Sequence, residues 1–272
     1  HTVGGYPEQL TRASDGSVYA RVAAMDAWGH ATLVYEGGTS ASTAAVILAR
    51  GYDQATGLEL STEAGRANAA PIVHLLTTWD GFANLRTRTD QVNASTETAR
   101  YDALNRLAGS TTTLTGGASL TRSYRYAADG NRTRACSGST CTDYSYGTHG
   151  AGPHALSAVN GNASGYAYNA GGEMTKDGGR SLTWSAFGKA LTITQGGTTL
   201  TLSYGPGNRR IRKSVTGPLS ETVTYLGGAE LLNVNGSLSI RRTLALAGIA
   251  IIDTGGAQSK RLYPIADHLG ST

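Results

Sequence analysis

The sequence predicts an all-β protein built from tandem antiparallel hairpins, and three observations support this prediction. Apolar residues make up 39% of the 272-residue chain, below the ~45–50% of ordinary globular domains. Glycine is abundant, with 37 residues, and tyrosine (14) far exceeds phenylalanine (2). A short segment that combines an aromatic residue with a bend recurs along the chain. Together these features indicate many short strands joined by tight turns, with polar residues on much of the sheet.

The recurring segment starts with an aromatic residue and reaches a glycine or asparagine four or five residues later. Its clearest copy is Tyr101–Leu107, with the sequence YDALNRL, and a degenerate copy starts at Met25. The remaining copies start at Tyr52, Trp79, Tyr126, Tyr168, Trp184, Tyr204 and Tyr225. Such regular recurrence predicts a repeat architecture.

Each part of the segment has a physical role in a hairpin. The aromatic residue ends the incoming strand, where its ring packs on the neighbouring hairpin. The Asp, Asn or Ser that often follows accepts hydrogen bonds from the turn backbone. The outgoing strand then alternates in polarity, as in Leu85–Thr89 and Leu191–Thr194. Between the turn Asp, Asn or Ser and the outgoing strand lies a position that must tolerate a positive φ. It is filled by Gly29, Gly57, Asn105, Gly130, Gly172, Gly188 and Asn208.

Glycine pairs predict the turns at the opposite ends of the hairpins. They occur at 37–38, 116–117, 178–179, 196–197, 227–228 and 255–256, whereas the pair at 171–172 falls inside an aromatic turn. The alanine content of residues 40–50 is compatible with a helix. A strand is favoured there, because Val46-Ile47-Leu48 directly precedes the turn segment at Tyr52. We therefore expect nine or ten hairpins, counted from these turns.

The two cysteines, Cys136 and Cys141, flank a four-residue Ser-Gly-Ser-Thr loop. A loop of this length brings two strand ends within bridging range, so we expect a hairpin-closing disulfide, with free thiols as the alternative. A disulfide indicates an oxidising compartment.

Charge and hydropathy point to no specific partner. The net charge is only +4, and the cluster Arg209, Arg210, Arg212 and Lys213 is expected to be a solvated or cross-strand paired face rather than a nucleic-acid site. The most apolar stretch, Leu244–Ile252, is far shorter than the ~20 residues of a membrane-spanning helix. No signal peptide precedes the repeats, and the chain begins at His1, so we expect a fragment of a longer polypeptide.

Hairpins of this kind must pair side by side, because a single hairpin cannot bury its apolar face alone. A sheet of many strands also twists and coils. With so few apolar residues, we expect a long curved or spiralling sheet around a polar or hollow interior, as part of a hollow shell.

Four segments of the chain resemble the Rhs, or YD-repeat, family. They are RGYDQATGLE (50–59), WDGFANLRTRTD (79–90), TETARYDALNRL (96–107) and YPIADHLGST (263–272). The last is similar to the start of the Rhs-associated core, and its Asp-His-Leu-Gly-Ser string is specific. The resemblance divides the chain into a repeat region, 1–262, and the start of the core motif, 263–272.

This resemblance implies a sheet that spirals into a cocoon around a C-terminal toxin domain. Members of the family include secreted bacterial effectors, shell subunits of insecticidal Tc toxins, and the animal teneurins. In several members the core cleaves itself through an aspartyl-protease-like site, whose residues would lie beyond this chain's final motif. We therefore transfer no catalytic residue. We expect a shell or scaffold segment rather than an enzyme, secreted or at the cell surface.

The expected partners follow from the same resemblance. They are the protein's own C-terminal cargo, further repeats before His1, the core and cargo after Thr272, and the secretion machinery. Two alternatives remain open: an extracellular adhesion or carbohydrate-binding protein, in which the aromatic residues stack on glycans, and a self-assembling extracellular fibre. No nucleic-acid partner is expected.

Candidate chemical sites have simpler structural interpretations. Asp267 and His268 are adjacent and would point to opposite faces of a strand, which favours a structural role. The six histidines are scattered, so no metal site is expected. No cofactor is expected either, since no phosphate-binding loop is present. The repeated aspartates are better explained by their position in the turns than as the carboxylate pair of a glycosidase. They are Asp26, Asp53, Asp80, Asp102 and Asp129.

Overall fold

The computed structural model describes residues 5–148, 151–246, 249–256 and 260–267. Within these ranges the chain forms 24 strands and one 3-10 turn, Pro206–Asn208, and has no α-helix. This confirms the predicted all-β class. None of the described residues belongs to a helix with the length and hydropathy needed to span a membrane.

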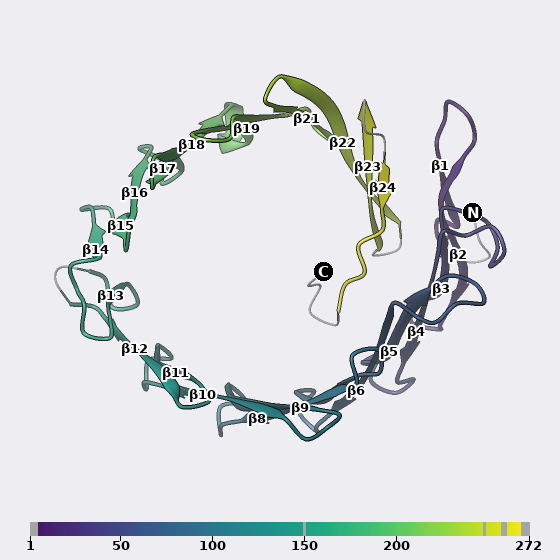
Figure 1. The fold of residues 1–272 in the computed structure, drawn as a ribbon, viewed down its shortest axis with the longest axis horizontal. Coiled ribbons are helices and arrows are strands. Elements are labelled where there is room, and N and C mark those ends of the chain that lie inside the picture. Colours follow the sequence, from purple (N-terminus) through teal and green to yellow (C-terminus); the bar gives the residue numbers. More distant parts are fainter. Residues whose placement is uncertain (1–4, 149–150, 247–248, 257–259, 268–272) are drawn as a thin grey trace. The chain divides into compact units, whose positions relative to one another are not determined.

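The strands form two open sheets, in which each strand is hydrogen-bonded to its neighbours in the sequence (Figure 1). The first sheet has 13 strands, which are β1 (Gln9–Thr11), β2 (Val18–Met25), β3 (Ala31–Glu36), β4 (Val46–Tyr52), β5 (Glu59–Gly65), β6 (Val73–Trp79), β7 (Leu85–Asp90), β8 (Ser95–Tyr101), β9 (Leu107–Leu114), β10 (Ser119–Tyr126), β11 (Arg132–Ser137), β12 (Thr140–Tyr146) and β13 (Leu156–Val159). The second has 11 strands, which are β14 (Tyr166–Tyr168), β15 (Met174–Asp177), β16 (Arg180–Trp184), β17 (Ala190–Gln195), β18 (Thr198–Tyr204), β19 (Arg210–Thr216), β20 (Glu221–Tyr225), β21 (Ala229–Val234), β22 (Ser237–Leu246), β23 (Ile249–Gly256) and β24 (Lys260–Leu262).

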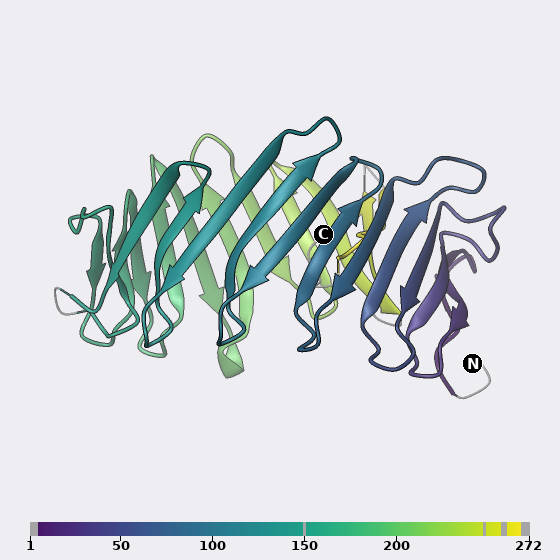
Figure 2. The same ribbon diagram turned by 90° about the horizontal axis from the view of Figure 1, so that it is seen from below.

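Consecutive strands pair antiparallel, so hairpin turns alternate between the two long edges of each sheet, where the strands end (Figure 2). This confirms the predicted tandem hairpins, but the predicted number of nine or ten was too low, because the described residues form 24 strands. In residues 40–50 the strand begins only at Val46, and the residues before it make a turn in which the Ala44 amide donates to the Ser40 carbonyl.

The glycine pairs do not all lie where the sequence predicted. The pairs at 116–117, 178–179 and 196–197 form turns at the edge opposite the aromatic turns. The prediction for Gly227–Gly228 is wrong, because this pair lies in the aromatic turn after Tyr225, which connects β20 with β21. Gly255 and Gly256 end strand β23. A glycine pair therefore marks a turn without specifying its edge.

The chain divides into two compact units, which we describe separately. Unit 1 comprises residues 1–123, 244–252 and 262–272, and unit 2 comprises residues 124–243 and 253–261. In unit 1, the facing residues Val22, Val34, Leu48 and Ala64 form a continuous buried row across β2–β5. Leu246 and Ile251, which are distant in sequence, pack against this row. We call this side of the unit 1 sheet the buried face.

The opposite side of the unit 1 sheet carries threonines in register. Thr78, Thr87, Thr98, Thr111 and Thr121 are successive cross-strand partners from β6 to β10. The hydroxyls of Thr78 and Thr87 lie 2.6 Å apart. Threonine combines high strand propensity with a polar tip, so it suits a sheet face that needs no apolar cover. This explains how the chain folds with so few apolar residues.

Unit 2 has a smaller apolar centre. Its buried hydrophobic residues are Ala158, Leu202 and Val223. Leu202 and Val223 both lie opposite Lys213, so they share one face of β18–β20. Threonine and serine pairs again line the other face, as in the 2.6 Å contact between the Thr183 and Thr192 hydroxyls.

Candidate functional site

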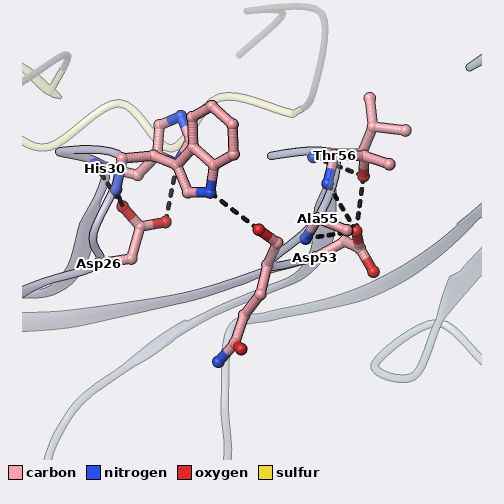
Figure 3. A network of polar contacts seen from close by, with 8 residues as sticks. Asp26, His30, Asp53, Ala55 and Thr56 are labelled. Atoms are coloured by element: carbon pink, nitrogen blue, oxygen red, sulfur yellow. Dashed lines mark hydrogen bonds and ion pairs between the residues drawn. The ribbon is translucent and has the colours of Figure 1, made fainter.

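The aspartates of the repeat organise the turns through their carboxylates. Asp26 accepts hydrogen bonds from the amides of Trp28 and His30, both at 2.9 Å, and its other oxygen lies 2.8 Å from His30 Nδ1 (Figure 3). In the next turn, Asp53 accepts bonds from the Ala55 amide and from both the amide and the hydroxyl of Thr56. These bonds, led by that of the Thr56 hydroxyl, hold the pKa of Asp53 below its ordinary value.

The same arrangement recurs in two later turns. Asp80 accepts bonds from the amides of Phe82 and Asn84, and Asp102 from those of Leu104 and Arg106. The carboxylates are therefore occupied by their own turns, as the sequence interpretation expected. Asp129 differs slightly, since it accepts bonds from the amide and the side chain of Asn131.

Neighbouring turns are also joined to one another. The Trp28 indole donates to the Gln54 carbonyl at 2.9 Å, and the His30 ring stacks on Tyr52 with 4.3 Å between ring centroids. Further along, the Asn84 side chain donates to Asn105 Oδ1 at 3.1 Å. The aromatic turns are thus linked to one another by side chains, in addition to the backbone hydrogen bonds between the strands.

The turn positions named from the sequence all have left-handed backbones. Gly29, Gly57, Asn105, Gly130, Gly172, Gly188 and Asn208 lie at φ values between 56° and 90°. No such residue was predicted for the Trp79 turn, where Ala83 takes this conformation with a φ of 62°. Alanine gives no compositional signal for it, so only the spacing from Trp79 could have found it.

Most repeat aromatics close onto the preceding hairpin through one recurring contact. The polar tip of the ring donates to the carbonyl of the residue that begins the preceding outgoing strand, and we call this contact the repeat hydrogen bond. It joins Tyr101 to Leu85, Tyr168 to Leu156, Tyr204 to Ala190, Trp79 to Glu59 and Trp184 to Met174, over 2.7–3.0 Å. The sheet register shifts by one residue at each of these aromatics. The shift turns the ring toward the preceding hairpin.

The other aromatics show the limits of the pattern. Tyr146 makes the same contact, to the Arg132 carbonyl at 3.0 Å, although the sequence analysis did not name it. Tyr126 ends β10 as expected. Tyr52 ends β4 and stacks on His30 instead. Tyr225 ends β20 without a register shift.

Cys136 and Cys141 form a disulfide between facing residues of β11 and β12, with 4.0 Å between their Cα atoms. The loop inside it is shorter than the sequence suggested, because Ser137 and Thr140 already pair in the ladder. The bridge therefore closes a tight hairpin within unit 2.

A buried acid lies on the buried face. Glu36 is fully buried between its cross-strand neighbours Ala20 and Val46. Neither carboxylate oxygen has a hydrogen-bond partner among the described residues. Burial raises the pKa of Glu36 from 4.5 to about 7, and the attraction of Arg50 opposes the rise.

The C-terminal residues Tyr263–Asp267 lie on the same face, and we call them the C-terminal segment. Tyr263 and Ile265 pack against the buried row. The Arg50 guanidinium reaches the Ala266 carbonyl at 3.5 Å, and Arg88 pairs with Asp267 at 3.1 Å while its other nitrogen binds Glu97 at 2.9 Å. Asp267 thus has an ion-pair partner in the sheet. Residues 268–272, which hold the rest of the terminal motif, lie outside the described residues, as do His1 and His149.

Comparison with known proteins shows the fold of the chain. No protein-family model matches it, and no curated protein is similar in sequence. The crystal structure of TcdB2-TccC3-Cdc42 aligns with 99% of the chain at a TM-score of 0.72 and 17% identity. The crystal structure of TcdB2-TccC3-TEV aligns with 88% of it at a TM-score of 0.67 and 16% identity. The chain spans only 16% and 14% of the lengths of those chains.

Proposed function

We propose that the chain is a section of the wall of an Rhs/YD-repeat shell that encloses a C-terminal toxin domain until delivery. The observation that carries this proposal is the C-terminal segment on the buried face. An extended stretch of polypeptide lies there, bound by Arg50 and Arg88 and packed on apolar residues. This face therefore accepts an extended chain segment next to the strand residues Leu246 and Ile251, which pack on the same row.

The fold and its neighbours support the proposal. The chain has the fold of part of the TcdB2-TccC3 structures, and its terminal motif resembles the start of the Rhs-associated core. All but the outermost strands of each sheet are paired on both sides, which leaves few free edges for unwanted pairing or proteolysis. The shell's action would be steric, and no described residue is given a catalytic role.

We place this shell outside the producing cell. The disulfide between Cys136 and Cys141 is typical of an oxidising compartment. The cargo, the remaining repeats and the secretion machinery are its proposed partners.

Two adjacent threonines of β9 provide a matched test of enclosure. Thr112 faces the same side as Glu97 and Arg88, which is the buried face, whereas Thr111 belongs to the threonine row on the other side. A photo-cross-linking amino acid is placed at either position in the full-length polypeptide. We expect cross-links to the cargo from position 112 and none from position 111. Equal cross-linking from both positions, or none from position 112, would refute the proposal.

A further inference from the structure

Several repeat turns contain one recurring side-chain contact. The aspartate that directly follows the aromatic position accepts a hydrogen bond from a polar side chain four residues further along the chain. Arg106 pairs with Asp102 at 2.7 Å, Asn84 donates to Asp80 at 3.0 Å, and His30 lies 2.8 Å from Asp26. The turn between β18 and β19 lacks this acceptor. Its arginine, Arg209, is the fifth residue after Tyr204, but the first residue after Tyr204 is Gly205. A Cβ at Gly205 would approach Ile211 Cγ2 at 3.0 Å, so the position is sterically restricted.

The next hairpin departs from the repeat as well. By the pattern of the other repeats, Tyr225 should donate to the carbonyl of Arg210, the first residue of β19. Among the described residues the Tyr225 hydroxyl makes no such bond, and no register shift occurs at this tyrosine. Instead the Arg210 guanidinium lies over the Tyr225 ring, 4.7 Å from its centroid.

A cleft lies between the turn after Tyr204 and the turn after Tyr225, the two places where the chain differs from the repeat pattern. Its volume is about 590 Å³, and it is lined by Pro206, Arg209, Arg210, Ile211, Tyr225 and Gly227. No acidic residue lines it. The acids on the adjoining strands are engaged elsewhere, since Glu221 pairs with Lys213 and Glu230 with Arg241. Within the described part of the chain, Arg209 has no carboxylate partner.

We propose that this cleft, which we call the arginine cleft, binds a carboxylated sugar unit, a uronate. Guanidinium groups bind carboxylates through paired N–H donors, and two are available here. The ligand carboxylate would supply the acceptor that Gly205 does not. The Tyr225 hydroxyl would bind a sugar hydroxyl, and Pro206 and Ile211 would contact the ring. The cleft volume lies within the ~300–1,000 Å³ typical of small-ligand sites. This inference does not depend on the proposed shell function.

Titration of the full chain with glucuronate, followed by calorimetry or ligand-detected NMR, tests the proposal. We expect one saturable site, with weaker or no binding of glucose, benzoate and inorganic phosphate. Arg209→Ala and Arg210→Ala should each weaken glucuronate binding about tenfold, the scale of one lost charge-assisted hydrogen bond. Arg210→Lys should also weaken it, because a lysine keeps the charge but loses the paired donors. This conservative variant preserves the test if the alanine variant fails to fold.

Two control variants isolate the cleft. Arg132→Ala removes a guanidinium that lies 5.0 Å from the Tyr144 ring centroid on another hairpin, and Tyr204→Phe removes a hydroxyl that is already bonded within the repeat. Neither should change glucuronate affinity. The proposal is overturned if glucuronate does not bind, if Arg132→Ala weakens it as much as Arg210→Ala, or if phosphate or benzoate binds as tightly as glucuronate.

Discussion

Single residues with a positive φ set the geometry of the hairpin turns. Gly130 lies at φ 90°, and a Cβ placed there would have nothing within 4 Å. The need for glycine at this position is therefore conformational and not a matter of space.

Replacing Gly130 with valine should destabilise the protein by about 1–3 kcal/mol, because a β-branched residue is strained at this φ. Gly81 supplies the control, since it has equally open surroundings but no positive φ. Gly81→Val should change stability by no more than about 0.5 kcal/mol. Denaturant unfolding measures both, and equal losses would contradict this assignment of the left-handed position.

Ala83 allows the opposite test. It holds a φ of 62° where the other turns have glycine or asparagine. An alanine in the left-handed region is strained by roughly 1–2 kcal/mol, only part of which is cancelled by the greater backbone entropy of unfolded glycine. Ala83→Gly should therefore raise the free energy of unfolding by about 0.5–1 kcal/mol. A decrease would show that Ala83 is not left-handed in solution.

At the scale of the hairpin, the repeat hydrogen bond joins most of the aromatic turns to the hairpin before them. Tyr101→Phe removes the 3.0 Å bond to the Leu85 carbonyl and should cost about 1 kcal/mol of stability. Tyr225→Phe removes a hydroxyl that makes no such bond and should be nearly neutral. Thermal unfolding of the two variants checks this, and a larger loss at Tyr225 would contradict the difference between the repeats.

The elements could be predicted where their signals are local. The aromatic ends of the strands, the turn aspartates and the left-handed glycines and asparagines follow from residue type and spacing within a few positions. Ala83 was not predicted because alanine gives no compositional signal for a positive φ. Tyr146, with Gly150 four residues later, fits the repeat pattern but was not among the predicted copies. Gly227–Gly228 was assigned to the wrong edge, because a glycine pair permits a turn at either edge.

At the scale of the whole molecule, contacts between distant segments could not be read from the sequence. Nothing in the local pattern indicates that Leu246, Ile251 and Tyr263 pack over β2–β4, or that Arg88 pairs with Asp267. The burial of Glu36 follows from that packing. A single acid on a strand otherwise suggests a solvent-facing position.

Glu36 gives this long-range packing a pH dependence. The unfolded protein releases the proton near pH 4.5, whereas the folded protein keeps it until about pH 7. The folded state therefore binds more protons in this window, and stability falls as pH rises through it. The loss should reach about 3 kcal/mol by about pH 8.

Arg50 on β4 favours the ionised form of Glu36, but its attraction does not outweigh the effect of burial, so the sign is unchanged. Glu36→Gln should flatten the dependence of unfolding free energy on pH, while Glu63→Gln, at a half-exposed position of β5, should not. An unchanged slope in Glu36→Gln would contradict the burial of this carboxyl.

The central claim is that one face of this repeat sheet encloses polypeptide while the other faces solvent. Rates of maleimide labelling at Thr111→Cys and Thr112→Cys in the full-length polypeptide test it most directly. Both positions are half-buried within this chain, so a large difference must come from what the shell encloses. The account predicts fast labelling at position 111 and protection at position 112 until the protein unfolds. Equal rates at the two positions in the folded protein would contradict it.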